Sequence, residues 1–215
     1  MSRPLHRFKA VVFDMDGLLL DTEVLWQKAE EALFAAHGGV FSHEDKMRVI
    51  GTSFDFTARY FAERLGEPPE RGRELVDEMT ETMFASVQRE VAGRPGAMEL
   101  VARLRGRVPL GLASNSPRRL VDAALASAGL TDAFAAIVTS EDVIHAKPAP
   151  DIYLEACRRL GSLPSETLAL EDSGSGIAAA KAAGLTCIAV PQYAETDVSA
   201  ADRVIDSLEA LLDEA

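Results

Sequence analysis

Two aspartates stand two residues apart where an apolar run near the start of the chain ends. The run AVVF occupies residues 10–13, Asp14 follows it directly, and Asp16 lies two positions further on, before Gly17. A carboxylate at the end of a buried strand can serve as a nucleophile, and a second one past a turn can carry protons to and from the reacting group. An isolated Asp-x-Asp pair is more often a solvated surface feature, so this pair needs support from the rest of the sequence.

Further polar groups follow apolar runs later in the chain. They are Ser114, Asn115 and Ser116 after the run at 108–113, Lys147 in HAKPAPD one loop after the run at 135–139, and Glu171 and Asp172 after the run at 167–170. Taken singly, each has a simpler explanation. Ser116 is better explained as a helix N-cap than as a ligand, and Asp172 could cap the helix that follows it. Lys147 alone would be a surface lysine, and Ser114 and Asn115 could equally be turn residues.

The elements around these residues alternate between apolar runs and amphipathic patterns. Strands are predicted at 8–14, 108–113, 135–139, 167–170 and 186–190, with a short one at 203–205. Helices are predicted at 98–104, from 116 to a stop at Gly129, at 151–160, at 176–183 and at the C-terminus. This alternation predicts an α/β fold with a doubly wound, mainly parallel sheet and helices on both of its faces.

The stretch between the first two strands differs because it contains helical patterns alone. Helices are predicted at 23–37, 54–65 and 73–91, and no convincing strand lies between residues 22 and 91. A crossover between parallel strands needs only about a dozen residues, whereas this one is several times longer. We therefore expect a catalytic core of residues 1–21 and 93–215 and an inserted all-helical domain of residues 22–92. The two joints are expected near residues 21–22 and 93–96.

A parallel sheet would bring the polar groups together, because ligands bind beyond the carboxyl ends of its strands. Up to four carboxylates in one crevice need a compensating cation, and Mg²⁺ prefers oxygen ligands and phosphate. Lys147, Ser114 and Asn115 would then bind the phosphate. With metal and phosphate in place, Asp14 would attack phosphorus and form an aspartyl-phosphate. Asp16 would protonate the leaving oxygen and then deprotonate water.

One motif points to a different ligand. GSGIAA at 174–179 fits the G-x-G-x-x-A dinucleotide fingerprint, and Glu195 lies about twenty residues further on. However, the motif belongs to the fourth strand rather than the first, and Glu171 and Asp172 directly before it would repel a pyrophosphate. We interpret the small residues as allowing a helix to begin close to the metal site.

Composition argues against several classes of partner. The chain has 215 residues with 34 acidic and 22 basic side chains, a net charge of −12, so we expect neither nucleic acid nor membrane as a partner. No apolar run approaches the ~20 residues of a membrane span, and the N-terminus shows no signal-peptide segment. Cys157 and Cys187 are expected to be reduced, buried thiols in a cytoplasmic protein. The four histidines do not cluster at metal-ligand spacing.

Four short segments carry a family likeness. FDMDG at 13–17, ASN at 113–115, KPAPD at 147–151 and LEDS at 170–173 resemble, in order and spacing, the four motifs of the haloacid dehalogenase superfamily. The resemblance covers essentially the whole chain. It implies a Mg²⁺-dependent aspartyl-phosphate mechanism, and it implies that the helical insertion is a C1-type cap.

The resemblance also implies roles for individual residues. Asp14 matches the nucleophile and Asp16 the general acid/base, while Ser114 and Lys147 match the phosphate-binding pair. Asp172 matches the metal ligand, together with Asp14 and the backbone carbonyl of Asp16. Glu171 is placed in the outer shell of the metal.

Within the superfamily, the chain resembles β-phosphoglucomutase and the sugar-phosphate phosphatases. Dehalogenases lack the second aspartate of the first motif, so Asp16 favours phosphoryl chemistry. A mutase cap supplies a histidine and an arginine for the bisphosphate intermediate, and the aligned positions here hold Trp26 and Phe54. With Glu23 and Gly51, these are the candidate substrate-contacting residues of the cap. Trp26 and Phe54 could equally pack the cap core.

We therefore expect a phosphoric monoester hydrolase that acts on a small phosphorylated metabolite, such as a sugar phosphate or a nucleoside monophosphate. The protein is expected to be a monomer or a weak homodimer. The alternatives are a phosphomutase and a non-enzymatic regulatory protein that keeps the fold. A protein of the last kind would not need both Asp14 and Asp16.

Overall fold

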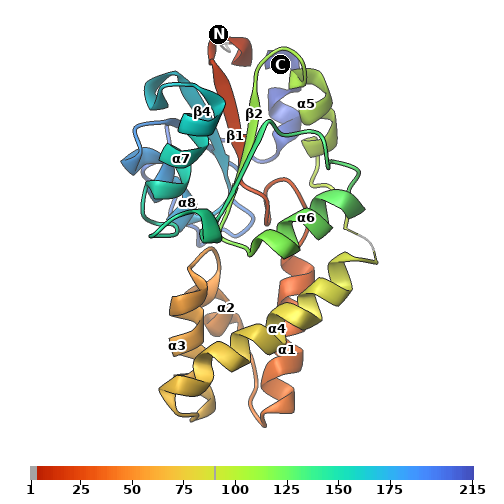
Figure 1. The fold of residues 1–215 in the computed structure, drawn as a ribbon, viewed down its shortest axis with the longest axis vertical. Coiled ribbons are helices and arrows are strands. Elements are labelled where there is room, and N and C mark those ends of the chain that lie inside the picture. Colours follow the sequence, from red (N-terminus) through yellow and green to blue (C-terminus); the bar gives the residue numbers. More distant parts are fainter. Residues whose placement is uncertain (1–3, 90) are drawn as a thin grey trace.

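The computed structural model describes residues 4–89 and 91–215 and is built around a six-stranded parallel sheet. The strands lie in the order β3-β2-β1-β4-β5-β6 (Figure 1). They are β1 (Ala10–Phe13), β2 (Leu110–Ser114), β3 (Ala136–Thr139), β4 (Thr167–Glu171), β5 (Thr186–Ala189) and β6 (Arg203–Val204). Every pairing in the sheet is parallel, which confirms the predicted fold class.

Helices cover both faces of the sheet. They are α5 (Ala97–Leu104), α6 (Arg118–Ser127), α7 (Asp151–Leu160) and α8 (Gly174–Ala182). Val11 and Phe13 of β1 belong to the same hydrophobic cluster as α5 and α6, whereas Val12 packs in the cluster formed with α7 and α8. Neighbouring residues of a strand point to opposite faces, so covering both faces explains why the strand reads as an uninterrupted apolar run.

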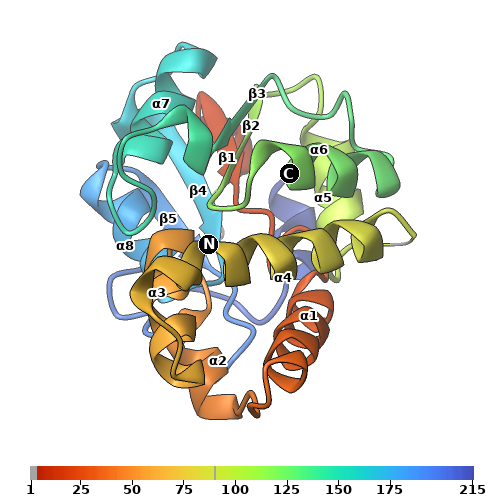
Figure 2. The same cartoon turned by 60° about the horizontal axis from the view of Figure 1, so that its bottom comes forward.

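Between β1 and α5, the chain forms four further helices. They are α1 (Glu23–Ala36), α2 (His43–Val49), α3 (Phe54–Leu65) and α4 (Gly72–Val87), and we call them together the helical insertion. They lie beyond the carboxyl ends of the strands, below the sheet in Figure 1 and toward the viewer in Figure 2. The described chain contains short 3-10 segments as well: η1 (Leu5–Arg7), η2 (Pro69–Arg71), η3 (Ser140–Asp142), η4 (Pro164–Glu166) and η5 (Leu208–Glu214).

The two chain segments that connect the sheet to the helical insertion run side by side. The backbone N–H of Asp21 donates to the carbonyl of Ala92 at 2.8 Å, and that of Arg94 donates to the carbonyl of Leu19 at 3.0 Å. An antiparallel bridge pairs Leu20 with Gly93. These contacts lie at the two places where the sequence predicted the joints of the insertion.

Three sequence expectations about the elements are corrected. Helix α2 was not predicted because HEDKMRV has no apolar periodicity; it is stabilised instead by a capping box between Ser42 and Asp45. The predicted C-terminal helix is the 3-10 segment η5, whose first residue receives no side-chain cap from Ser207. The helix predicted to reach residue 91 ends at Val87. None of the helices in the described ranges is long and apolar enough to cross a membrane.

Candidate active site

The polar residues that follow the strands meet at one edge of the sheet. Asp14 follows β1, Ser114 ends β2, and Glu171 and Asp172 stand at the end of β4. Strand β1 pairs with both β2 and β4, so these carboxyl ends are neighbours. Lys147 comes from the loop before α7 and reaches the same place with a side chain that is only 2% exposed. The sheet therefore brings together the groups that the sequence placed in one crevice.

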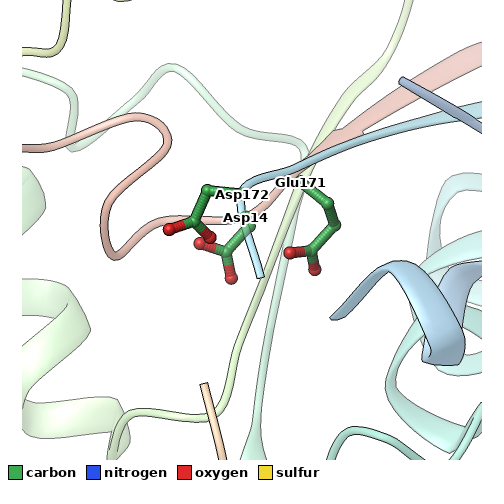
Figure 3. A group of neighbouring side chains, drawn as sticks. All are labelled: Asp14, Glu171 and Asp172. Carbon is green, nitrogen blue, oxygen red and sulfur yellow. The ribbon is translucent and has the colours of Figure 1, made fainter. Parts of the chain in front are cut away.

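Three buried carboxylates form the centre of this site. Asp14, Glu171 and Asp172 each offer an oxygen atom, and these atoms all lie within 4.8 Å of one another (Figure 3). Burial raises the pKa of Asp14 and that of Asp172 well above their usual values, and the neighbouring carboxylates add to this effect. Oδ2 of Asp14 is buried and receives no hydrogen bond from the part of the chain that the structure describes.

These features fit a hard divalent cation. Three carboxylates beside one lysine leave an excess of negative charge that burial makes unfavourable, and a doubly charged ion would neutralise it. The donors are oxygen atoms alone, which is the ligand set that Mg²⁺ prefers. Asp14 and Asp172 are the residues best placed to hold the ion, because Glu171 already accepts two hydrogen bonds through Oε1.

Lys147 is bound within the acidic cluster. Its Nζ donates to Oδ1 of Asp14 at 2.6 Å, to Oε1 of Glu171 at 2.6 Å and to the carbonyl of Ala113 at 2.9 Å. The two carboxylates raise the pKa of Lys147, although burial opposes them, so the ammonium stays charged. Tyr153 of α7, which the sequence analysis did not single out, donates its hydroxyl to Glu171. The expected contact of Lys147 with a phosphate remains a prediction.

The carboxylate of Asp16 does not belong to the group of Asp14, Glu171 and Asp172, and four side chains hold it. The expected contact of its backbone carbonyl with the metal remains a prediction. Oδ2 accepts from Ser114 at 3.1 Å and from Ser116 at 2.8 Å. Oδ1 accepts from Thr22 at 2.7 Å and from Nε1 of Trp26 at 3.0 Å. The first pair comes from the core and the second from the start of the helical insertion. Asp16 therefore lies where the two parts of the chain meet.

The expectation that Ser116 caps a helix is wrong. Helix α6 begins at Arg118 with Pro117 at its N-cap position, and no side chain caps it. The hydroxyl of Ser116 is instead directed to Asp16. The cap interpretation of Asp172 fails as well, because Ser173 caps α8 by accepting a hydrogen bond from the N–H of Gly176.

The side-chain amide of Asn115 forms hydrogen bonds with the backbone of Lys147 and is therefore not fully exposed to the cavity. Its Oδ1 accepts from the N–H of Lys147 at 3.0 Å, and its Nδ2 donates to the carbonyl of Lys147 at 3.3 Å. Nδ2 also lies 3.4 Å from the carbonyls of Gly51 and Thr52 in the helical insertion. Asn115 thus positions the lysine loop against the insertion, and its predicted role in phosphate binding stays a prediction.

A cavity of about 80 Å³ lies between the carboxylate cluster and the helical insertion. Four insertion residues that the sequence nominated line it: Glu23, Trp26, Gly51 and Phe54. The rings of Trp26 and Phe54 pack edge to face with their centres 5.9 Å apart. Lys46 and Glu30 also line the cavity and were missed. Buried charges in an insertion of unknown packing give no periodic signal in the sequence.

The glycine-rich motif at 174–179 has a structural explanation. A Cβ added to Gly176 would overlap the carboxylate of Glu171. The helix begins so close to the acidic cluster that only glycine fits at this position. This agrees with the interpretation of the motif as a close approach to the metal site.

The family model for haloacid dehalogenase-like hydrolases matches residues 8–184. The chain belongs to this family. Hexitol phosphatase B of Escherichia coli is 34% identical over 194 residues, which cover 89% of this chain and 86% of the relative. Protein CbbY of Rhodobacter capsulatus is 35% identical over 220 residues, 96% of each chain.

Solved structures agree with the fold of this family member. The crystal structure of CbbY from Rhodobacter sphaeroides in complex with phosphate superposes with a TM-score of 0.83 at 32% identity, over 96% of this chain and 99% of that one. The family is thus supported by the sequence motifs, the sheet topology and the likeness of nearly the whole chain.

Proposed function

We propose that this protein is a Mg²⁺-dependent phosphatase that hydrolyses a small phosphorylated metabolite, a sugar phosphate or a nucleoside monophosphate, through an aspartyl-phosphate. The observation that carries the proposal is the environment of Asp14. Its carboxylate stands at the end of β1 beside Asp172 and Lys147, and one of its oxygens has no hydrogen-bond donor in the described chain. The names of the relatives, hexitol phosphatase among them, support the reaction class.

The first half of the reaction transfers the phosphoryl group to the enzyme. An oxygen of Asp14 attacks phosphorus while the bond from phosphorus to the substrate oxygen breaks. Asp16, in its protonated form, gives its proton to that leaving oxygen. Ser114 and Lys147 contact the phosphate oxygens, and the ammonium group of Lys147 balances part of their charge. Asp14 and Asp172 would hold the Mg²⁺ ion, which would supply further positive charge at the phosphate.

The second half releases inorganic phosphate. Asp16 takes a proton from a water molecule whose oxygen attacks phosphorus, and the bond between phosphorus and Asp14 breaks. Both carboxylates thereby return to their starting states. Asp16 is suited to both proton transfers because its carboxylate lies outside the group of Asp14, Glu171 and Asp172 and lines the cavity.

We assign residues 22–92 the role of a cap over the catalytic core of residues 1–21 and 93–215. The paired segments around Leu20 and Gly93 are the natural hinge. With the cap closed, bulk water is kept from the developing charge. Two hydrogen bonds join the cap to the core. One runs from Trp26 to Asp16, and the other runs from Asn115 to the carbonyl of Gly51.

A phosphatase is favoured over a phosphomutase by the cap side of the cavity. A mutase has to hold a second phosphate there. Trp26 and Phe54 provide no positive charge, and Lys46, the basic residue that the described insertion contributes to the lining, is paired with two carboxylates. A hydrolase needs only to admit the neutral part of the substrate and one water molecule. The small cavity also suits a metabolite rather than a macromolecule.

The test is release of phosphate from 4-nitrophenyl phosphate with Mg²⁺, with excess chelator, and by two variants. Asp14→Asn should reduce kcat by about a thousandfold or more. Asp122→Asn, at an exposed carboxylate paired with Arg118, should keep full activity. Undiminished release in excess chelator, or by Asp14→Asn, would contradict the proposed mechanism.

A further inference from the structure

A buried group of three charged side chains lies in the helical insertion. Glu23 and Glu30 are two turns apart on α1, and Lys46 reaches them from α2. Nζ of Lys46 lies 2.8 Å from Oε2 of Glu23 and 3.0 Å from Oε2 of Glu30, and all three side chains are only 6 or 7% exposed. All three line the same cavity as Asp14. We call them the cap charge group.

The cap charge group is not fully satisfied by the protein itself. Lys46 makes a hydrogen bond to Glu30, but its approach to Glu23 lacks hydrogen-bond geometry. Oε2 of Glu23 is buried and accepts no hydrogen bond from the described residues. The Lys46 ammonium, 2.8 Å away, is the one partner of this oxygen among the described residues. Because Glu23 lines the cavity, its carboxylate can accept a further hydrogen bond from a ligand there.

The balance of charge in this group restricts the ligand. Lys46 is the one basic residue that the described insertion contributes to the cavity lining, and two carboxylates flank it. The Lys46 ammonium is already shared between these two buried carboxylates, so a further negative charge nearby would find no free counter-charge. Hydroxyl groups are suited to such a site, because they donate to carboxylate oxygens and accept from the ammonium group.

We infer that the cap charge group binds hydroxyl groups of the part of the substrate that is not transferred, and that it excludes a second anionic group. The substrate class is then a polyhydroxylated chain or ring that carries a single phosphate. This inference rests on the proposed phosphatase function and narrows its substrate. The adjacent rings of Trp26 and Phe54 offer the apolar contact that carbon-bound hydrogens of such a molecule need.

The first experiment compares three substrates with the unmodified protein and Mg²⁺: glucitol 6-phosphate, n-hexyl phosphate and glucose 1,6-bisphosphate. The hexyl ester has the same chain length as the hexitol ester but no hydroxyl groups. We expect kcat/KM for glucitol 6-phosphate to exceed that for either of the others by about tenfold or more. Equal cleavage of the hexyl ester, or of the bisphosphate, would overturn the inference.

The second experiment uses variants of nearly unchanged shape. Glu23→Gln should raise KM for glucitol 6-phosphate about tenfold, with kcat and the kinetics of n-hexyl phosphate changed less than about twofold. Glu31→Gln alters the exposed neighbour of Glu30 on the same helix. It should leave KM and kcat for both substrates unchanged. An equal loss with both substrates in Glu23→Gln would overturn the inference, because it would indicate a structural role.

The failure of this inference and that of the proposed function give different results. If 4-nitrophenyl phosphate is cleaved but the three substrates are not distinguished, the phosphatase stands and the hydroxyl-binding role is wrong. If the protein with Mg²⁺ cleaves none of the four phosphate esters, the proposed function is wrong and this inference falls with it. The comparison of substrates needs no variant, so it remains decisive even if Glu23→Gln does not fold.

Discussion

The indole Nε1 of Trp26 donates a hydrogen bond to Oδ1 of Asp16 over 3.0 Å, and it does so from the first helix of the insertion. Thr22, at the N-cap position of the same helix, donates to the same oxygen at 2.7 Å. The proposed acid/base is thus held in part by the segment that we assign to the cap. Movement of that segment would change the hydrogen bonds of Asp16. We therefore expect cap position and proton transfer to be coupled.

Trp26→Phe tests this coupling. The substitution keeps an aromatic ring to pack against Phe54 but removes the N–H donor. Because a hydrogen bond typically contributes about 0.5–1.5 kcal/mol, poorer positioning of Asp16 should lower kcat by up to about tenfold. Steady-state kinetics with 4-nitrophenyl phosphate measure this. Phe54→Tyr serves as a control that leaves the Trp26 donor in place, and a kcat for Trp26→Phe equal to that of the unmodified protein would disprove the positioning role.

Gly51→Ala tests the contact between the insertion and the core. Gly51 has φ +68°, and an added Cβ would lie 2.7 Å from Cβ of Ser173 and 2.9 Å from Oγ of Ser175. Gly66 is the matched control, because it has φ +69° and no atom within 4 Å of an added Cβ. Both substitutions should destabilise the fold by about 1 kcal/mol through the left-handed backbone.

The two glycine variants should differ in catalysis. In Gly51→Ala the added methyl group pushes the insertion away from Ser173, so kcat/KM should fall about tenfold or more, whereas Gly66→Ala should stay within about twofold. Urea denaturation and phosphatase kinetics together separate strain from contact. Equal kinetics for the two variants would show that the Gly51 contact has no functional part.

Mg²⁺ should stabilise the protein through Asp172. At 100 times its dissociation constant, a ligand of the folded state adds about 2.7 kcal/mol to the free energy of unfolding. For a chain of this length, that is a rise in Tm of roughly 5–10 °C. Thermal denaturation with and without Mg²⁺ measures this rise. It should disappear in Asp172→Asn and persist in Asp122→Asn; a rise that survives in Asp172→Asn would place the ion elsewhere.

The core of the site could be predicted from the sequence because its geometry follows from local rules. Asp14 comes directly after an apolar run and Asp172 one residue after another, and parallel strands with covered faces present their carboxyl ends at one edge. The position of each residue along its own strand was therefore enough to bring the two together. No long-range contact had to be known.

The cap side could be predicted only in part, because its contacts depend on tertiary packing. Nothing in HEDKMRV indicates that Lys46 is buried between two glutamates, since a charged heptapeptide is normally a solvated helix face. Ser116 was assigned to a helix cap because a serine before a proline is typical of one. The hydroxyl is instead directed to Asp16, and these two residues are 100 positions apart in the sequence. Such pairings have no local signal.

The pH dependence of stability should reveal the burial of Glu30. Desolvation raises its pKa from the usual 4.5 to about 7, against the opposing effect of Lys46. Between these two values the folded protein keeps a proton on Glu30 that the unfolded chain has released. The free energy of unfolding therefore contains a favourable contribution below pH 4.5 that is lost as the pH rises to about 7. Glu23, whose pKa is also raised by burial, acts in the same direction.

Glu30→Gln should remove this dependence, because glutamine resembles the protonated carboxyl group at every pH. A shift from 4.5 to about 7 corresponds to about 3 kcal/mol. Urea denaturation at pH 5 and at pH 8 measures how much stability each protein loses over this range. The loss should be smaller in Glu30→Gln than in the unmodified protein, by up to about 3 kcal/mol. Glu31→Gln, at the exposed neighbouring position, should change the pH dependence far less, because Glu31 is the smallest of the named contributions to the pKa of Glu30. If Glu30→Gln loses as much stability over this range as the unmodified protein, the carboxyl group is already ionised in the folded state at pH 5, and Lys46 would then compensate its burial completely.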